Sequence, residues 1–205
     1  MSSLDEAMKE GNEDVEKEAI ENSTKLLLQY ISVVKERNFP LGMDVQDGEG
    51  IKEFLIKPGE KEGEEPKLLF GGKEISFEDA VKNQGLRGAM KQNTHLLDPK
   101  TMIDNIIAYV KKTGKPLDFD YTGPDGKTKK MTITPGSNGG VTIYNQGQTM
   151  DLSELKKMLA GDKSFKAKLK GKIKDGFISK IVEIGKSPVK KPLDAINKTS
   201  VTWGR

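Results

Sequence analysis

The chain has 205 residues, of which 34% are hydrophobic and 32% charged, enough apolar surface for one core or two small ones. It contains no cysteine, and this excludes disulfide bonds, thiolate metal sites and a cysteine nucleophile. The net charge is +3, but residues 1–22 carry eight acids and two bases, whereas residues 156–191 carry twelve lysines and three acids.

The contrast in charge between the two ends indicates an acidic arm and a basic segment that suits an acidic protein or a polyanion. Plain solubilisation, with pairing between the two ends, is the alternative interpretation. The N-terminus lacks the apolar stretch of a signal peptide, and no apolar run is long enough to cross a bilayer. We therefore expect a cytoplasmic protein without a membrane span, with export lacking a cleaved signal as the open alternative.

Residues 1–21 are predicted to be an acidic arm or an extension of the first helix. The acid run and Gly11 favour a frayed or disordered arm, whereas the residues on either side of Gly11 permit a helix. The sequence leaves both forms open.

Residues 22–84 are predicted to form a unit in the order α-β-β-β-(β)-α. A helix beginning at Asn22 or Ser23 carries an apolar stripe and stops before Pro40, because proline clashes with a preceding helical turn. Alternating runs and glycine-rich turns then predict antiparallel strands, with "LLFGGKEI" as a tight hairpin. A second helix opens on the capping box "SFED" at residues 76–79. The stripe comprises Leu26, Leu27, Tyr30 and Ile31, and the strands contain Met43-x-Val45 and Phe54-x-Ile56.

A linker is expected over residues 85–97, and residues 98–160 repeat the same order of elements. Asp98 is a strong helix N-cap because Pro99 follows at the first helical position. The helix stops before Pro116, and a capping box, "DLSE", opens the last helix at residues 151–154. The helix stripe comprises Met102, Ile103, Ile106 and Ile107, and the strands contain Phe119-x-Tyr121 and Met131-x-Ile133.

The two units match each other in sequence at a nearly constant offset. Between residues 34–45 and 110–121, shifted by 76, five of twelve positions are identical, where composition alone gives about one. The changes of offset fall in turns, where insertions are tolerated. We therefore predict an α+β protein of two tandem, divergent repeats with small antiparallel sheets, an acidic N-terminal arm and a basic C-terminal extension.

Residues 161–205 are predicted to be a basic C-terminal segment and tail. The pattern of residues 165–184 permits two predictions. Apolar residues recur every four positions, which favours a helix: Phe165, Leu169, Ile173, Phe177 and Ile181. Lysines also alternate with other residues, which favours a hairpin. The helix is the preferred prediction.

The search for catalytic residues yields no convincing constellation. His95 is the only histidine, and no nucleophile motif accompanies it. Asp118 and Asp120 share one face of an alternating strand, but carboxylates beside a turn are usually solvated. We expect no enzyme activity, no metal and no cofactor.

The order α-β-β-β-α is similar to that of the double-stranded-RNA-binding domain, and "GPDGK" at residues 123–127 falls where that family carries its minor-groove loop. The family's histidine is replaced here by Gly126, and its phosphate-binding helix start by Asp151. The resemblance therefore covers topology and one loop only.

The leading hypothesis is a non-catalytic interaction protein, namely an adaptor, scaffold or assembly component with a protein partner. The alternative is a nucleic-acid-binding protein acting through the second unit and residues 156–191, because residues 23–84 carry twelve acids against nine bases and residues 99–160 nine bases against six acids. The candidate contact residues for a polyanion or a partner are Lys156, Lys157, Lys163, Lys166, Lys168, Lys170, Lys172, Lys174, Phe165, Leu169 and Ile173.

Overall fold

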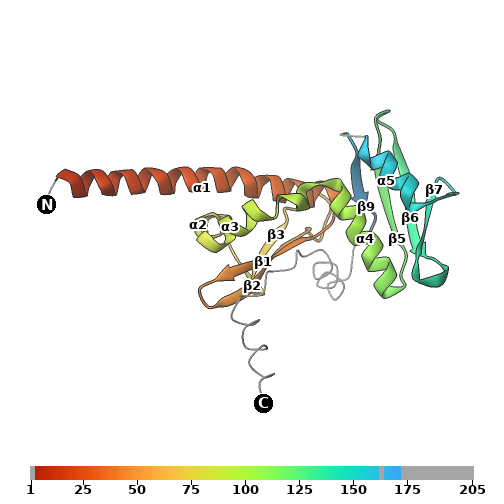
Figure 1. Ribbon diagram of the computed structural model, residues 1–205, viewed down its shortest axis with the longest axis horizontal. Helices are drawn as coiled ribbons and strands as arrows, with labels where there is room; N and C mark the ends of the chain where they lie inside the picture. The colour runs from red at the N-terminus through yellow and green to blue at the C-terminus, as the bar shows by residue number, and fades with distance from the viewer. Residues whose placement is uncertain (1–2, 162–163, 172–205) are drawn as a thin grey trace, which may run out of the picture.

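The computed structural model describes residues 3–161 and 164–171. It is a mixed α+β protein with two small antiparallel sheets and flanking helices (Figure 1), as the strand and cap patterns predict. Two separate hydrophobic clusters pack against the two sheets, and we call them the first core and the second core in chain order. None of the helices within the described ranges has the length and apolar character needed to span a membrane.

Helix α1 (Ser3–Arg37) is much longer than the helix predicted to begin at Asn22 or Ser23. Its C-terminal half packs Leu27, Tyr30 and Val34 into the first core, while its N-terminal part extends away from the rest of the molecule (Figure 1). Of the two forms open for the acidic arm, the helical one is therefore present from Ser3 onward. Ser23, expected as a cap, lies instead in the helix interior and is buried.

The first sheet comprises β1 (Leu41–Asp47), β2 (Gly50–Lys57), β3 (Lys67–Phe70) and β4 (Lys73–Glu74), paired in that order. Alternate residues of β1 and β2 point into the first core, where Met43, Val45, Phe54 and Ile56 are buried beneath the helices. Gly71 and Gly72 form the β3–β4 turn with positive φ angles, as the hairpin pattern predicts.

The segment expected to be a linker is helical and belongs to the first core. After α2 (Phe77–Lys82), which Ser76 caps, the chain forms α3 (Gln84–Gln92) and the 3₁₀ helix η1 (Thr94–Leu97). Leu86, Met90 and Leu96 are buried there, and the Tyr30 hydroxyl donates a 2.7 Å hydrogen bond to the Met90 carbonyl. Burial raises the pKa of this hydroxyl. The two glycines of α3 weaken its sequence signal, but Gly85 lets α3 approach β1, because a Cβ there would lie 2.9 Å from the Gln46 carbonyl oxygen.

The second sheet follows α4 (Pro99–Thr113). Asp98 caps α4 by accepting a hydrogen bond from the Lys100 amide, and the helix ends at Gly114 in the left-handed conformation. The strands are β5 (Leu117–Thr122), β6 (Thr128–Pro135), β7 (Val141–Asn145) and β8 (Gln148–Met150), with the 3₁₀ helix η2 (Ser137–Gly139) between β6 and β7. The predicted capping box of Asp151 and Glu154 opens α5 (Leu152–Ala160).

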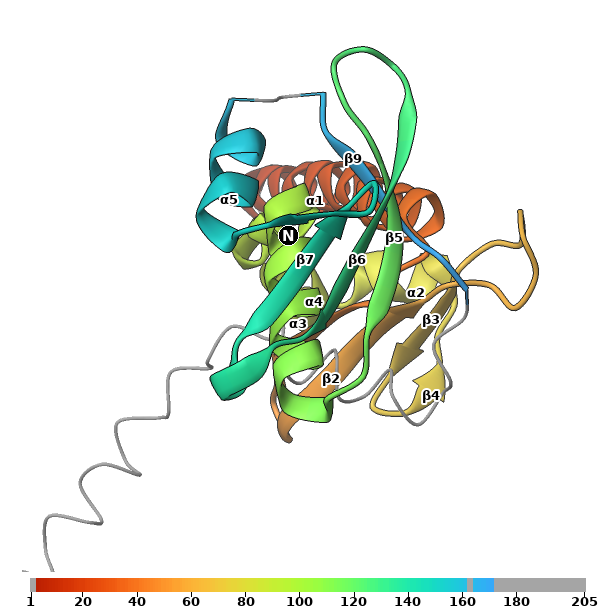
Figure 2. The same ribbon diagram turned by 90° about the vertical axis from the view of Figure 1, so that its right-hand side faces the viewer.

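A helix is the preferred prediction for residues 165–184. It is wrong for the described residues of this segment, because β9 (Lys166–Leu169) is a strand that pairs antiparallel with β5. The sheet order is β8-β7-β6-β5-β9, and Figure 2 shows β5, β6, β7 and β9 side by side in this sheet. Lysine alternation decides the structure here, because a strand puts Phe165, Ala167 and Leu169 into the second core and leaves the lysines outside. The predictions for Lys163 and for residues 172–205 lie outside the described residues.

The end of α1 joins the two halves of the molecule through three consecutive residues, which we call the junction. The buried Arg37 guanidinium donates to the main-chain carbonyls of Leu96, Leu97 and Asp98. Asn38 adopts a left-handed φ of 49°, and its amide group donates to the carbonyl oxygens of Leu169 at 3.2 Å and Gly171 at 2.8 Å. Phe39 then enters the second core, although it precedes the first sheet in the chain. Burial lowers the pKa of Arg37, and nearby Asp98 acts in the opposite direction.

Candidate interaction surfaces

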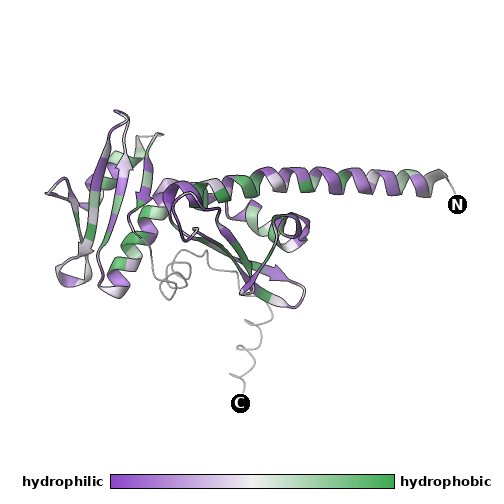
Figure 3. Ribbon diagram, turned by 180° about the vertical axis from the view of Figure 1, so that it is seen from behind, coloured by the Kyte–Doolittle hydropathy of each residue, from purple (hydrophilic) through white to green (hydrophobic). Residues whose placement is uncertain are grey.

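The N-terminal part of α1 offers a long helical surface apart from both cores. Glu16 makes a 3.0 Å ion pair with the buried Arg87 of α3, and residues 3–15, which we call the projecting segment, precede this contact. The side chains of residues 6–15 are all exposed. Figure 3 shows that hydrophilic residues predominate along this part of the helix.

Two large apolar side chains interrupt the charge of the projecting segment. Met8 is 64% exposed and Val15 67% exposed. Their seven-residue spacing puts them on the same face of the helix, about 10 Å apart along its axis. Five acids and one lysine in residues 3–15 give the segment a net charge of −4. The segment therefore has an apolar stripe in an acidic helix.

The second sheet's open face, which is the face opposite α4, carries Lys166 and Lys168 of β9 and Lys170 directly after it, and we call these three the β9 lysines. Lys166, Lys168 and Lys170 are exposed there, and two residues along a strand separate each from the next by about 7 Å. Lys170 lies 3.1 Å from Asp120, and Lys168 lies 3.5 Å from Glu62 of the first half. Part of the positive charge is therefore compensated within the molecule.

The structure does not gather all the predicted contact residues on one surface. Lys156 and Lys157 are exposed on α5, whose Leu155 and Leu159 enter the second core from the side opposite the β9 lysines. Phe165 and Leu169 are buried in that core and Phe165 stacks on Tyr121, so neither side chain is available to a partner in this structure. Lys163, Lys172, Ile173 and Lys174 lie outside the described residues.

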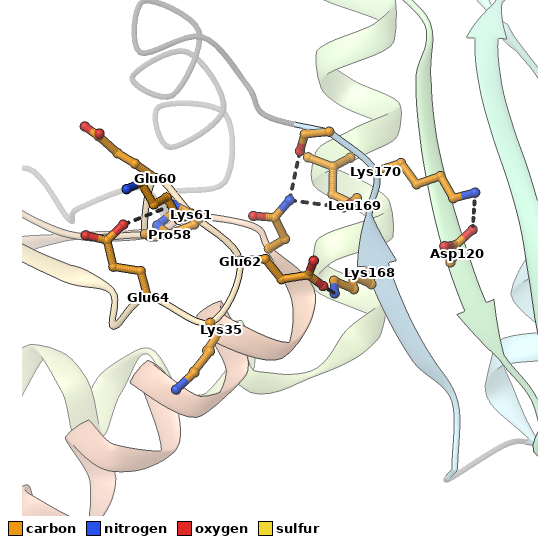
Figure 4. A pocket seen from close by; sticks show the side chains of 14 residues that line it. Lys35, Pro58, Glu60, Lys61, Glu62, Glu64, Asp120, Lys168, Leu169 and Lys170 are labelled. Carbon is orange, nitrogen blue, oxygen red and sulfur yellow. Dashed lines mark hydrogen bonds and ion pairs between the residues drawn. The ribbon is translucent and has the colours of Figure 1, made fainter.

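A polar cleft of about 550 Å³ opens beside the junction, between the β2–β3 loop and β9 (Figure 4). Side chains of both charge signs line the cleft. The basic ones are Lys35, Lys61, Lys168 and Lys170, and the acidic ones are Glu60, Glu62, Glu64 and Asp120. The Lys168–Glu62 pair crosses the cleft and joins the two halves, whereas Lys170 pairs with Asp120 within the second half. The cleft has no long-range excess of one sign that would select a charged ligand.

The carboxylates considered for catalysis are in ordinary surface pairs. Asp118 and Asp120 share the open face of β5, as predicted, and Asp118 accepts a 2.6 Å hydrogen bond from Thr132. Lys130 lies 3.7 Å from Asp118. His95 lies on the surface in η1, away from this strand in the fold. Within the described residues there is no cluster of three or more His, Asp or Glu side chains that could hold a metal ion.

The comparisons with known proteins find no matching family model, no matching curated protein and no matching solved structure.

Sequence reasoning identified the acidic charge at the N-terminus and the lysine alternation of β9, but missed the apolar stripe of α1. Met8 and Val15 are separated by acids and by Gly11, so the stripe becomes evident only when the segment is helical. The seven-residue spacing was the available signal.

Proposed function

We propose that the protein is a non-catalytic interaction protein, an adaptor, scaffold or assembly component, and that it contacts a protein partner through the projecting segment. The observation that carries this proposal is the exposure of Met8 and Val15 on a helix that lacks a packing surface of its own over these residues. An isolated helix of this length, with a glycine near its centre, is marginal in water. A partner that covered the stripe would stabilise it.

The chemistry of the segment specifies what the partner offers. An apolar groove about two helical turns long would take Met8 and Val15, in the manner of other amphipathic helices that dock in grooves. Basic residues at the rim of the groove would complement the net charge of −4. We therefore propose a partner with a basic-rimmed apolar groove, in the cytoplasm.

We also propose that residues 22–84 and 98–160 are divergent copies of one α+β unit. The proposal is supported by the shared order of a helix, four strands and a helix, and by the meander pairing of β1 to β4 and of β5 to β8. The two units differ beside their first strands. In the second unit β9 pairs with β5, whereas in the first unit helix α3 packs beside β1. Such divergence would let two similar units present different surfaces.

A photo-crosslinking experiment tests the proposed contact. A photoreactive amino acid placed at Met8 or Val15 in the full chain, expressed in its native cells, should form a covalent adduct with a protein. The same amino acid at Lys9 or Glu13 is the matched control, because both positions are about 100–140° around the helix from the stripe. Adducts only at positions 8 and 15 are expected. Equal adducts at all four positions, or none at any, would refute the proposal.

Polyanion binding by the β9 lysines is a second candidate, favoured by the regular row of Lys166, Lys168 and Lys170 on one open face. It predicts duplex binding whose log–log salt slope is near −0.9 per phosphate neutralised. Replacing these three lysines by glutamine should then remove binding, whereas replacing Lys156 and Lys157 on the other side of the sheet should leave it. Absence of duplex binding by the wild-type protein at low salt would eliminate this candidate.

A further inference from the structure

The first sheet has an apolar patch on its outer face, which is the face turned away from its helices. Leu55 of β2 and Leu69 of β3 lie directly opposite each other in the strand register and are half-buried. Ile51 lies further along the same face of β2 and is 52% exposed. Among the described residues, neither Leu55 nor Leu69 belongs to the first or second core. A sheet face that contacts only solvent usually carries polar residues at such central positions.

The equivalent face of the second sheet provides a contrast within the same molecule. With the offset that aligns Phe54 with Met131, the position of Leu55 is occupied by Thr132. Thr132 donates a 2.6 Å hydrogen bond to Asp118, its partner on β5, and it pairs on its other side with Tyr144 of β7, which is 40% exposed. The second sheet thus has a hydrogen-bonded polar side chain at the position where the first has Leu55.

The shape of the patch suits a side chain laid across it. Gly42 of β1 pairs with Leu55 and offers no side chain, so the sheet is flat on that side of the leucines. Asp44 and Glu53 lie opposite each other at the margin of the patch. The margin of the patch is therefore acidic, which is opposite in charge to a lysine-rich segment.

The described chain ends near the start of β1, which is an edge strand of this sheet. The Asn38 amide holds Gly171 by a 2.8 Å hydrogen bond, and Asn38 precedes the start of β1 by three residues. The 34 residues that follow, 172–205, therefore continue from the margin of the first sheet. Six extended residues cover about 20 Å, whereas β1 to β3 are separated by only about 10 Å. Phe177 can reach the centre of the sheet from Gly171.

The sequence of residues 172–184, "KIKDGFISKIVEI", has the matching chemistry. It contains six apolar residues, three lysines and two acids. Phe177 and Ile181 are far more apolar than a solvated tail requires, and the lysines are opposite in charge to the acidic margin of the patch. We propose that residues 172–184 of the same chain cover the outer face of the first sheet, with Phe177 and Ile181 on Leu55 and Leu69.

This covering has a consequence for both candidate functions. It places Lys172, Lys174 and Lys180 against the acidic margin of the first sheet, which removes them from any polyanion site on β9. It does not involve the projecting segment, so the covering and the proposed partner contact stand or fall separately.

Thiol labelling tests the proposal in the full chain, because the protein has no cysteine of its own. Leu55→Cys is compared with the matched control Thr132→Cys at the equivalent half-buried position of the second sheet. The labelling rate by a water-soluble thiol reagent should be about ten-fold lower for Leu55→Cys, because labelling there requires the covering segment to open. Adding Phe177→Ser with Ile181→Ser should abolish this difference and leave the rate of Thr132→Cys unchanged.

The possible outcomes separate the occupants of the patch. Equal labelling of the two cysteines in the otherwise unchanged chain would overturn the proposal. Slow labelling that persists after Phe177→Ser with Ile181→Ser would overturn it too, since another part of the protein would then cover the face. Slow labelling that becomes fast on dilution, with a matching fall in molecular mass, would assign the face to a second copy instead. Disulfide formation gives independent support that does not depend on labelling rates. We expect a disulfide in the double variant Leu69→Cys with Ile181→Cys, and none in the control Thr142→Cys with Ile181→Cys.

Discussion

Phe39→Ala is expected to lower the free energy of unfolding by about 3–5 kcal/mol, as for other large core truncations. Phe39 is 1% exposed in the second core, although the residues before and after it belong to the first half of the molecule. Its removal would leave a cavity that Pro40 and the left-handed Asn38 prevent the backbone from closing. Denaturant unfolding of the purified variant measures the loss.

The same substitution should also weaken the coupling between the two halves. Hydrogen exchange in Phe39→Ala should accelerate first in β5 and β9 and less in β1 and β2, because the cavity lies in the second core. Phe77→Ala, which truncates a half-buried phenylalanine at the margin of the first core, is the matched control and should cost less. A loss for Phe39→Ala below that of the control would mean that the junction is not a packed contact.

Ile106→Ala should destabilise the protein by about 2–5 kcal/mol. Ile106 is fully buried on the face of α4 that packs on the second sheet. Leu28→Ala removes a side chain of similar size from α1, but Leu28 is 54% exposed, and exposed substitutions usually change stability by no more than about 0.5 kcal/mol. Thermal or denaturant unfolding of the two variants should therefore give clearly different midpoints. Equal midpoints would show that the α4 stripe is a surface rather than a core.

Local signals predicted much of the fold because the residues that carry them act over short distances. Asp98 with Pro99 marks the start of α4, and the Asp151 capping box marks that of α5. The apolar stripes place Leu27 and Tyr30 in one core and Ile103 and Ile106 in the other, as their spacing predicts. Ile31, in the same predicted stripe, is only half-buried because it lies at the margin of that face.

Features that depend on distant residues could not be predicted in this way. Helix α3 has glycines that argue against a helix, and its stability comes from burying Leu86 and Met90 under α1. The strand form of Lys166–Leu169 depends on the free edge of β5, about fifty residues away in the chain. The placement of Phe39 in the second core depends on how the two halves meet, which no local pattern encodes.

The candidate site was predicted in charge but not in geometry. The acidic count of the N-terminus follows directly from the sequence, whereas the helical form of residues 3–15 brings Met8 and Val15 onto one face. The basic segment appeared uniform in sequence, yet the second core separates the lysines of α5 from those of β9 and hides Phe165. Charge patterns therefore indicate partner chemistry, and the fold determines which charges act together.

Recovery of the partner by variants of the projecting segment tests the central claim most directly. Met8→Ser with Val15→Ser removes the apolar stripe, and Lys9→Ser with Glu13→Ser changes as many residues of the same segment without changing its net charge. Both variants alter exposed residues outside the cores, so the melting midpoint of each should stay close to that of the wild type. The two variants are compared at equal amounts of folded protein. For the stripe variant, the recovered amount of the crosslinked partner should fall at least about ten-fold, which is the loss expected from two buried apolar contacts. For the control variant, it should stay near the wild-type level. Equal recovery by the two variants would contradict the claim that the stripe of α1 is the partner's binding surface.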